Sequence, residues 1–160
     1  MKREMKVHGL VVDPVSQMPV VILRAVDEEE RMLPIWVGHF EADAIYREMQ
    51  KMAPPRPMTH DLLRDVIQGL DATVNEITVC DLREETFYAR VSLQRGGEEV
   101  FVDSRPSDAI ALALRAGCPI FVEELVMDRA AAFDPEEKKA EAQREWLESL
   151  KTEDLGKYEM

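Results

Sequence analysis

Residues 100–122, VFVDSRPSDAIALALRAGCPIFV, constrain the fold more than any other part of the chain. They begin and end with short apolar runs, which predict two strands. Between the runs, Pro106 suits the first turn of a helix and Gly117 suits its end. Residues 109–114 are apolar on every side of this helix, so we expect it to be buried. A strand, a buried helix and a second strand in so short a stretch predict a compact β-α-β crossover.

Polar residues gather where the first of these strands ends and the helix begins. They are Asp103, Arg105, Ser107 and Asp108. Open α/β sheets often place ligand sites at such a junction. The structural alternative is that Arg105 pairs with Asp103 or Asp108 and closes the turn. Residue types alone favour the structural alternative and leave the ligand site as a hypothesis.

The rest of the chain predicts further strands and helices. Strands are expected at residues 6–13, 18–26, 31–37, 73–82 and 86–94, and helices at residues 38–52 and 60–70. Apolar and polar residues alternate over residues 86–94, and Gly96-Gly97 suits a hairpin turn into the strand at residue 100. We therefore expect an α+β fold with a mixed, largely antiparallel sheet and helices packed on it.

The second predicted helix carries a strong apolar stripe. Thr59 is the expected N-cap, with His60 and Asp61 in the first turn. The residues expected to face the core are Leu62, Leu63, Val66, Ile67 and Leu70.

The C-terminal segment differs in composition from the rest of the chain. Residues 134–160 predict a highly charged helical tail, so we divide the chain into a domain at residues 1–133 and a tail at 134–160. The tail helix should run to about Lys151, with Phe133, Trp146, Leu147 and Leu150 as its few apolar anchors.

The chain is acidic, with a net charge of −12. Nine acids and five bases give the tail −4, which leaves −8 for the rest. A nucleic-acid partner must therefore meet a local basic patch or a bound cation. No apolar run predicts a membrane span or a secretory signal, and Cys80 and Cys118 suit free thiols better than a disulfide, so a cytoplasmic protein is expected.

Three motifs occur together in this order: residues 33–42, with LPIWVG followed by Glu41-Ala42; residues 56–62, RPMTHDL; and residues 86–89, TFYA, with residues 103–113, DSRPSDAIALA. In this combination the chain resembles the bifunctional nuclease domain family, over about residues 7–127. Ser104 stands where the family more often has Ala, and His39 stands at a position expected to vary, so His39 is not a catalytic candidate.

The resemblance implies a mixed α+β fold, oligomerisation and cleavage of both DNA and RNA, but it brings no agreed set of catalytic residues. On the nuclease hypothesis, the catalytic candidates are His60, Asp61, Asp103, Arg105 and Asp108. Arg105 would bind a phosphate and His60 would act as general base or acid.

Metal assistance is part of this hypothesis. The candidate ligands of Mg²⁺ or Mn²⁺ are Glu41, Asp61, Asp103 and Asp108, and the metal would activate water.

The competing hypothesis is a non-catalytic, oligomeric binding or regulatory module in which Arg105–Asp108 and His60–Asp61 fix turns. Residue chemistry alone favours this module, whereas the resemblance favours the nuclease. Open sheet edges and sparse apolar anchors in the tail also predict a homo-oligomer, most simply a dimer.

Overall fold

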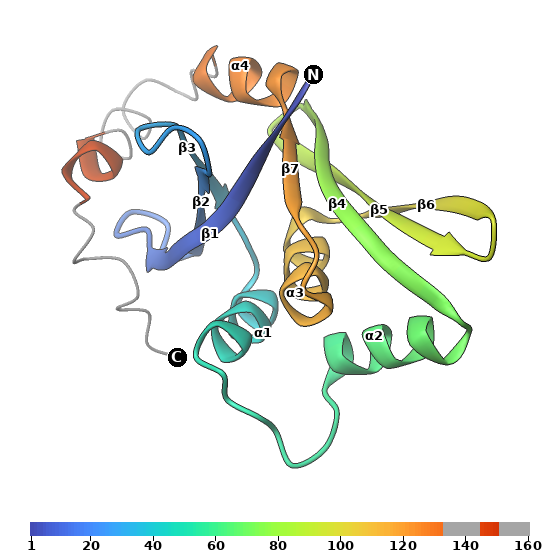
Figure 1. The fold of residues 1–160 in the computed structure, drawn as a ribbon. Helices are drawn as coiled ribbons and strands as arrows, with labels where there is room; N and C mark the ends of the chain where they lie inside the picture. Colours follow the sequence, from blue (N-terminus) through green and yellow to red (C-terminus); the bar gives the residue numbers. More distant parts are fainter. Residues whose placement is uncertain (133–144, 151–160) are drawn as a thin grey trace.

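The computed structural model describes residues 1–132 and 145–150 (Figure 1). Seven strands form one sheet in the order β3-β2-β1-β7-β4-β5-β6. The strands are β1 Lys2–Val12, β2 Pro19–Ala25, β3 Met32–Trp36, β4 Ala72–Arg83, β5 Thr86–Arg95, β6 Glu98–Ser104 and β7 Ile120–Glu123. β4 and β7 pair in parallel, and the other neighbours are antiparallel. The predicted α+β fold with a mixed, largely antiparallel sheet is confirmed.

Helices pack against the sheet, and one of them lies at one end of it. α1 His39–Met49 and α2 Thr59–Gly69 both pack against α3 Pro106–Ala116, which therefore lies between them, and α3 itself packs on β4 and β5. α4 Glu124–Ala132 follows β7 and packs against β4 near the N-terminus of the chain (Figure 1). Within the described residues, no helix is both long and apolar enough to cross a membrane.

The predicted β-α-β crossover is confirmed, in a wide form. β6 and β7 are both parallel to β4, so β6, α3 and β7 form a parallel connection that passes over β5 and β4. Ile110 and Leu112 of α3 are fully or almost fully buried. The helix ends at Gly117, whose φ of +70° is a left-handed conformation that suits glycine.

The orientation predicted for α2 is wrong for four of its five apolar residues; the fifth, Ile67, is partly buried and packs against the core. Leu62, Leu63, Val66 and Leu70 are 41–56% exposed, whereas His60 and Asp61 are buried. The first turn of α2 is fixed to α3 by polar contacts, and these turn the apolar stripe away from the core. The N-cap is Met58 rather than Thr59, and its backbone N–H donates to the side chain of Asp61 at 2.9 Å.

The tail prediction falls mostly outside the described residues. Residues 133–144 and 151–160, including Phe133, Asp134 and Lys151, are not described, and the division of the chain at residue 134 stays a prediction. Residues 145–149 are helical. Trp146, Leu147 and Leu150 pack against a small apolar cluster of Val11, Val20 and Ile22 on β1 and β2.

Candidate active site

The first turns of three helices meet at one cluster of polar side chains. Glu41 lies in the first turn of α1, His60 in that of α2 and Asp108 in that of α3, while Arg105 is the N-cap of α3. We call these four residues the helix-start cluster. Direct contacts join all four, and they come from sequence segments up to 67 positions apart. The positive ends of the helix dipoles favour negative charge here.

His60 and Asp108 form a hydrogen-bonded pair. His60 Nε2 lies 2.9 Å from Asp108 Oδ1, and the His60 side chain is only 11% exposed. An ionised carboxylate only accepts hydrogen bonds, so Nε2 is the donor of this pair, and the second ring nitrogen, Nδ1, is not used by it. Among the described residues, no buried side-chain nitrogen or oxygen lacks a partner. Nδ1, for which these residues supply no partner, therefore reaches the surface.

Arg105 joins the carboxylates of two helices at the surface. Its Nη2 lies 2.6 Å from Glu41 Oε1 and 2.8 Å from Asp108 Oδ2, and its Nε donates to the same Asp108 oxygen at 2.9 Å. The hydrogen bonds to Asp108 and then to Glu41 raise the pKa of Arg105. The Arg105 side chain is nevertheless 65% exposed. It is a permanent positive charge that solvent and ligands can reach.

Asp61 belongs to a neighbouring, buried ion pair. Arg115 Nε lies 2.7 Å from Asp61 Oδ1, and the Arg115 side chain is 4% exposed. Arg115 also donates to the carbonyls of Ala111 and Ala44, so it ties α1, α2 and α3 together. Burial acts to raise the pKa of Asp61, but the hydrogen bonds from Met58 and Arg115 outweigh it and hold that pKa below its ordinary value.

The five catalytic candidates from the sequence do not form a single network. Asp108, Arg105 and His60 are brought together, whereas Asp61 pairs with Arg115 on the inner side of α2. Asp103 is an exposed residue of β6, opposite Arg90 of β5, and no contact in the described structure joins it to Arg105. The predicted pairing of Arg105 with Asp108 is present, and its second partner is Glu41.

The four candidate metal ligands do not come together in the described part of the chain. Within residues 1–132 and 145–150, no three His, Cys, Asp or Glu side chains gather closely enough to hold a metal ion. Glu41 and Asp108 meet only through Arg105, and Asp61 and Asp103 lie apart from them. The residues present therefore do not form a ready-made metal site.

Two residues of this region were missed in the sequence. Arg115 stands at the end of an otherwise apolar, buried helix, and this is a signal that it needs a buried anionic partner. Phe40 directly precedes Glu41 and is 90% exposed. Its signal was weaker, because a single aromatic residue in a first helical turn usually packs on the core.

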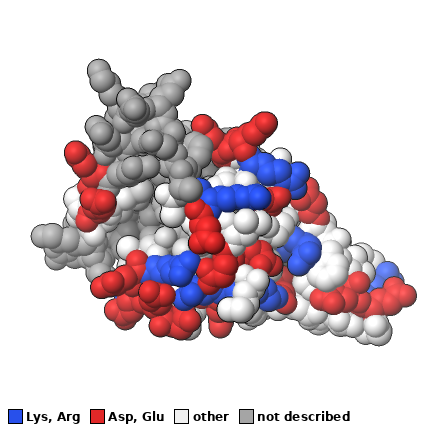
Figure 2. Space-filling model, turned by 90° about the horizontal axis from the view of Figure 1, so that it is seen from above, with Lys and Arg blue, Asp and Glu red and all other residues white. Residues whose placement is uncertain are grey.

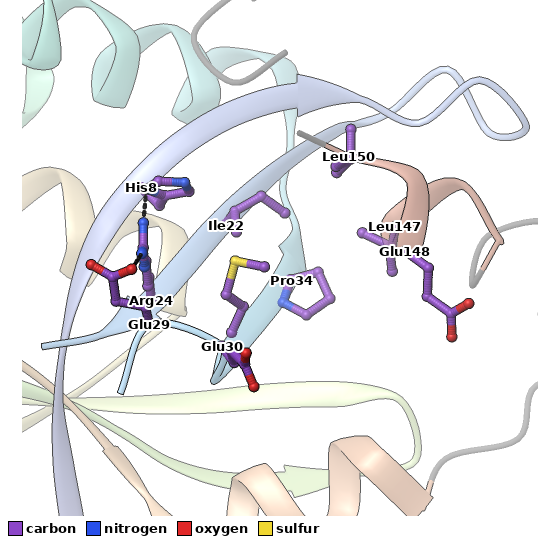
Figure 3. A pocket seen from close by; sticks show the side chains of 10 residues that line it. His8, Ile22, Arg24, Glu29, Glu30, Pro34, Leu147, Glu148 and Leu150 are labelled. Carbon is purple, nitrogen blue, oxygen red and sulfur yellow. Dashed lines mark hydrogen bonds and ion pairs between the residues drawn. The ribbon is translucent and has the colours of Figure 1, made fainter. Parts of the chain in front are cut away.

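A separate pocket lies on the other side of the sheet from this cluster's helices, between the strands and the short helix at residues 145–149 (Figure 3). It has a volume of about 440 Å³, and His8, Arg24 and Glu29 line one end of it. Arg24 Nη1 lies 3.4 Å from His8 Nδ1. Burial and the nearby positive charges of Arg24 and Lys6 lower the pKa of His8. None of the candidate residues from the sequence lines this pocket.

Comparison with known proteins links the chain to one protein family. A family model described as bifunctional nuclease domain matches residues 21–135. Uncharacterized protein Rv1829 of Mycobacterium tuberculosis is 45% identical over 139 residues, which are 87% of this chain and 82% of that protein. Bifunctional nuclease 1 of Oryza sativa subsp. japonica is 25% identical and Bifunctional nuclease 2 of Arabidopsis thaliana 28% identical, each over 105 residues. These residues are 64% of this chain and 32% of each plant protein.

Proposed function

Because this chain belongs to the bifunctional nuclease domain family, we propose that it hydrolyses phosphodiester bonds of DNA and RNA at the helix-start cluster. The observation that carries the proposal is the pair of buried His60 with Asp108 beside an exposed Arg105. A proton acceptor and a phosphate-binding cation thus lie within one group of contacting residues. The plant relatives are about three times as long as the stretch they share with this chain, so their activities enter only as support.

Each residue has a chemical role in this proposal. The planar fork of Arg105 binds the scissile phosphate and balances the charge that develops on its oxygens. Asp108 holds the imidazole of His60 with Nε2 protonated, so Nδ1 takes a proton from the attacking water. The hydroxide oxygen forms a bond to phosphorus, and the bond from phosphorus to the leaving oxygen breaks. The leaving oxygen takes a proton from solvent water, and His60 then returns its own proton to solvent. Phe40 offers an exposed ring on which a base can stack.

Assistance by Mg²⁺ or Mn²⁺ stays a proposal without an assigned step. The helix-start cluster supplies two carboxylates, and Mg²⁺ is commonly held by one or two carboxylates together with phosphates of the substrate. An ion could therefore arrive with the nucleic acid even though the described residues form no metal site alone. Cleavage assays with Mg²⁺, with Mn²⁺ and with a chelator test this dependence.

The surface charge favours a second candidate, the non-catalytic binding or regulatory module. Figure 2 shows Lys and Arg interleaved with Asp and Glu on the visible face, without a broad basic stripe. Arg105 already pairs with two carboxylates, which suits a structural role. A phosphate must compete with Glu41 and Asp108 for this guanidinium.

The deciding experiment is the substitution His60→Gln in highly purified protein. Gln can donate to Asp108 but cannot take up a proton, so cleavage of single-stranded DNA and RNA should fall by roughly 10²–10⁴-fold. His39→Gln is the matched control, because His39 is exposed in the first turn of α1 and makes none of the contacts of the helix-start cluster. Unchanged cleavage by His60→Gln, or equal cleavage by a mock-purified extract, would refute the proposal.

A further inference from the structure

A second pocket lies next to the helix-start cluster, between the end of α1 and the start of α2. It has a volume of about 390 Å³. Its wall is residues 51–57, which belong to the loop that runs from α1 to α2 (Figure 1). We call it the α1–α2 pocket, and the charged residues that line it are Glu48, Lys51, Arg56, Asp61 and Arg64.

The α1–α2 pocket and the helix-start cluster share two helices. On α2, His60 belongs to the cluster, and the next residue, Asp61, lines the pocket. On α1, Glu41 of the cluster and Glu48 of the pocket are seven residues apart, which is about 10 Å of helix. A nucleic-acid strand rises about 3.4 Å per nucleotide when its bases are stacked. A strand cleaved at the cluster therefore reaches the pocket within about three nucleotides.

The α1–α2 pocket has a local surplus of positive charge, although the chain has a net charge of −12. Three cations line it against two carboxylates, and one of these carboxylates, that of Asp61, is already neutralised by Arg115. The pocket of Figure 3 has the opposite balance, with one arginine against three glutamates. An acidic protein that binds nucleic acid needs such a local group of cations, because the phosphates supply most of the attraction.

Arg56 is the cation that is best prepared to bind a new anion. It is exposed, and within the described part of the chain no hydrogen bond or ion pair joins it to another residue. Pro55 and Pro57 stand on either side of it. Proline fixes its own φ and restricts the residue before it to extended conformations, so the backbone at Arg56 is nearly rigid. Little conformational entropy is therefore lost from this loop when a phosphate binds.

Lys51 and Arg64 hold their carboxylate partners only weakly. Lys51 Nζ lies 3.8 Å from a Glu48 oxygen, and the Lys51 side chain is 81% exposed. Arg64 Nη2 lies 3.1 Å from a carboxylate oxygen of its neighbour Asp65, whose side chain is 44% exposed. Solvent-exposed ion pairs contribute little to stability, whereas hydrogen bonds from a cation to a phosphate are strong. A phosphate can therefore recruit both side chains without breaking a contact that the fold requires.

We propose that the α1–α2 pocket binds a backbone phosphate of the single-stranded substrate, within about three nucleotides of the bond that is cleaved. Arg56 is its principal ligand, and Lys51 and Arg64 support it. The inference rests on the proposed nuclease function, because it takes the helix-start cluster as the place of cleavage. The contact positions the strand and does not read the identity of the bases. It also gives a role to Arg56 as the first residue of the RPMTHDL motif.

The test measures binding of a short, fluorescein-labelled oligothymidylate by fluorescence anisotropy over a range of NaCl concentrations. All proteins carry His60→Gln, which keeps the probe intact, and a phosphorothioate probe with the native His60 is used if that variant does not fold. Each phosphate contact to a single strand adds about 0.7 to the slope of the logarithm of affinity against the logarithm of salt concentration. Arg56→Gln should therefore lower this slope by about 0.7 and weaken binding roughly fivefold at about 0.1 M salt. Arg56→Lys keeps the charge and should restore the slope.

Arg95→Gln is the matched control, because it changes the net charge of the chain by the same amount. Arg95 is exposed at the end of β5 and lies opposite Ala72, beyond the far end of α2 from the pocket. Its slope should equal that of the parent protein. Equal slopes for Arg56→Gln and Arg95→Gln would overturn the inference, whether both fall or neither does.

Cleavage assays with the native His60 distinguish failure of this inference from failure of the proposed function. Arg56→Gln should raise KM for the oligothymidylate by roughly fivefold with little change in kcat, because the contact is the same in the ground state and the transition state. Cleavage with an unchanged KM and an unchanged salt slope would overturn the pocket and leave the nuclease standing. A lower slope without cleavage by the wild type would support the pocket and refute the nuclease. A wild type that binds no oligothymidylate at low salt would overturn both.

Discussion

Replacement of Arg105 by Lys separates a phosphate-binding role from a structural one. Lys keeps the positive charge but lacks the planar fork that contacts two oxygens at once. If Arg105 binds the scissile phosphate, cleavage should fall by roughly 10²-fold, the usual cost of losing one well-placed donor to a developing oxyanion. Because the family membership does not fix residue roles, this substitution tests the chemistry directly.

The structure also sets the expected change in the free energy of unfolding. The Arg105 side chain is 65% exposed, although its partners Glu41 and Asp108 are 15% and 30% exposed. Ion pairs with so exposed a member contribute about 0–1 kcal/mol, and Lys can retain part of this. A change of at most about 1 kcal/mol shifts Tm by about 2–4 °C in a chain of this size.

Arg115 provides the matched comparison, because it is an arginine in the same region with a carboxylate partner but a buried side chain. Breaking a fully buried pair costs about 3–5 kcal/mol, so Arg115→Ala should lower Tm by roughly 6–20 °C. Arg105→Lys should therefore lose cleavage with little loss of stability, whereas Arg115→Ala should lose stability first.

The measurements are urea unfolding and cleavage of a labelled single-stranded oligonucleotide, made on the same preparation. An extract purified in parallel from cells that lack the protein controls for traces of host nuclease. A clear loss of stability with unchanged cleavage by Arg105→Lys would contradict the reasoning and leave Arg105 as a residue that closes the start of α3.

Two further predictions concern Phe40 and Asp61. Phe40→Ala should raise KM for single-stranded substrates with little change in kcat, since the ring is 90% exposed and available for stacking; an unchanged KM in steady-state assays would exclude that role. Asp61→Asn should lower the free energy of unfolding by about 3 kcal/mol at neutral pH, because it breaks the buried pair with Arg115. The pKa of Asp61 is below its ordinary value, so this stabilisation is complete above about pH 4 and is lost as the pH falls through the folded-state pKa. Urea unfolding at neutral and acidic pH should show that the free energies of unfolding of the wild type and of Asp61→Asn approach each other in acid. A difference that stays constant with pH would refute the pairing of Asp61 with Arg115.

The sequence by itself determined the elements whose signals are local. In β6, α3 and β7, the apolar runs, Pro106 and Gly117 all lie within 23 residues, and the structure contains the predicted strand, buried helix and strand. The antiparallel arrangement of β4, β5 and β6 was likewise predictable, because alternation and a Gly-Gly turn act between neighbouring strands. The three motifs also sufficed to predict the family.

Only the tertiary structure decided which side of α2 faces the core. The apolar stripe of α2 predicts an inward orientation, but the buried contacts of His60 with Asp108 and of Asp61 with Arg115 hold the polar side inward. These contacts join residues 48 and 54 positions apart. Local periodicity shows that α2 carries an apolar stripe. Which side of the helix is buried depends on contact partners that lie elsewhere in the chain.

The partners of Arg105 likewise include one that the sequence predicts and one that only the tertiary structure supplies. The nearby Asp108 was predictable from its spacing of three residues, but Glu41 lies 64 positions away and meets Arg105 only because α1 and α3 pack together. Asp103, two residues from Arg105, was expected in the cluster and instead lies opposite Arg90 on the exposed strand. β6 ends at Ser104 and Arg105 is already the N-cap of α3, so the chain changes direction between the two residues. Proximity along the chain therefore does not bring their side chains together, whereas packing of distant helix starts brings Glu41 to Arg105.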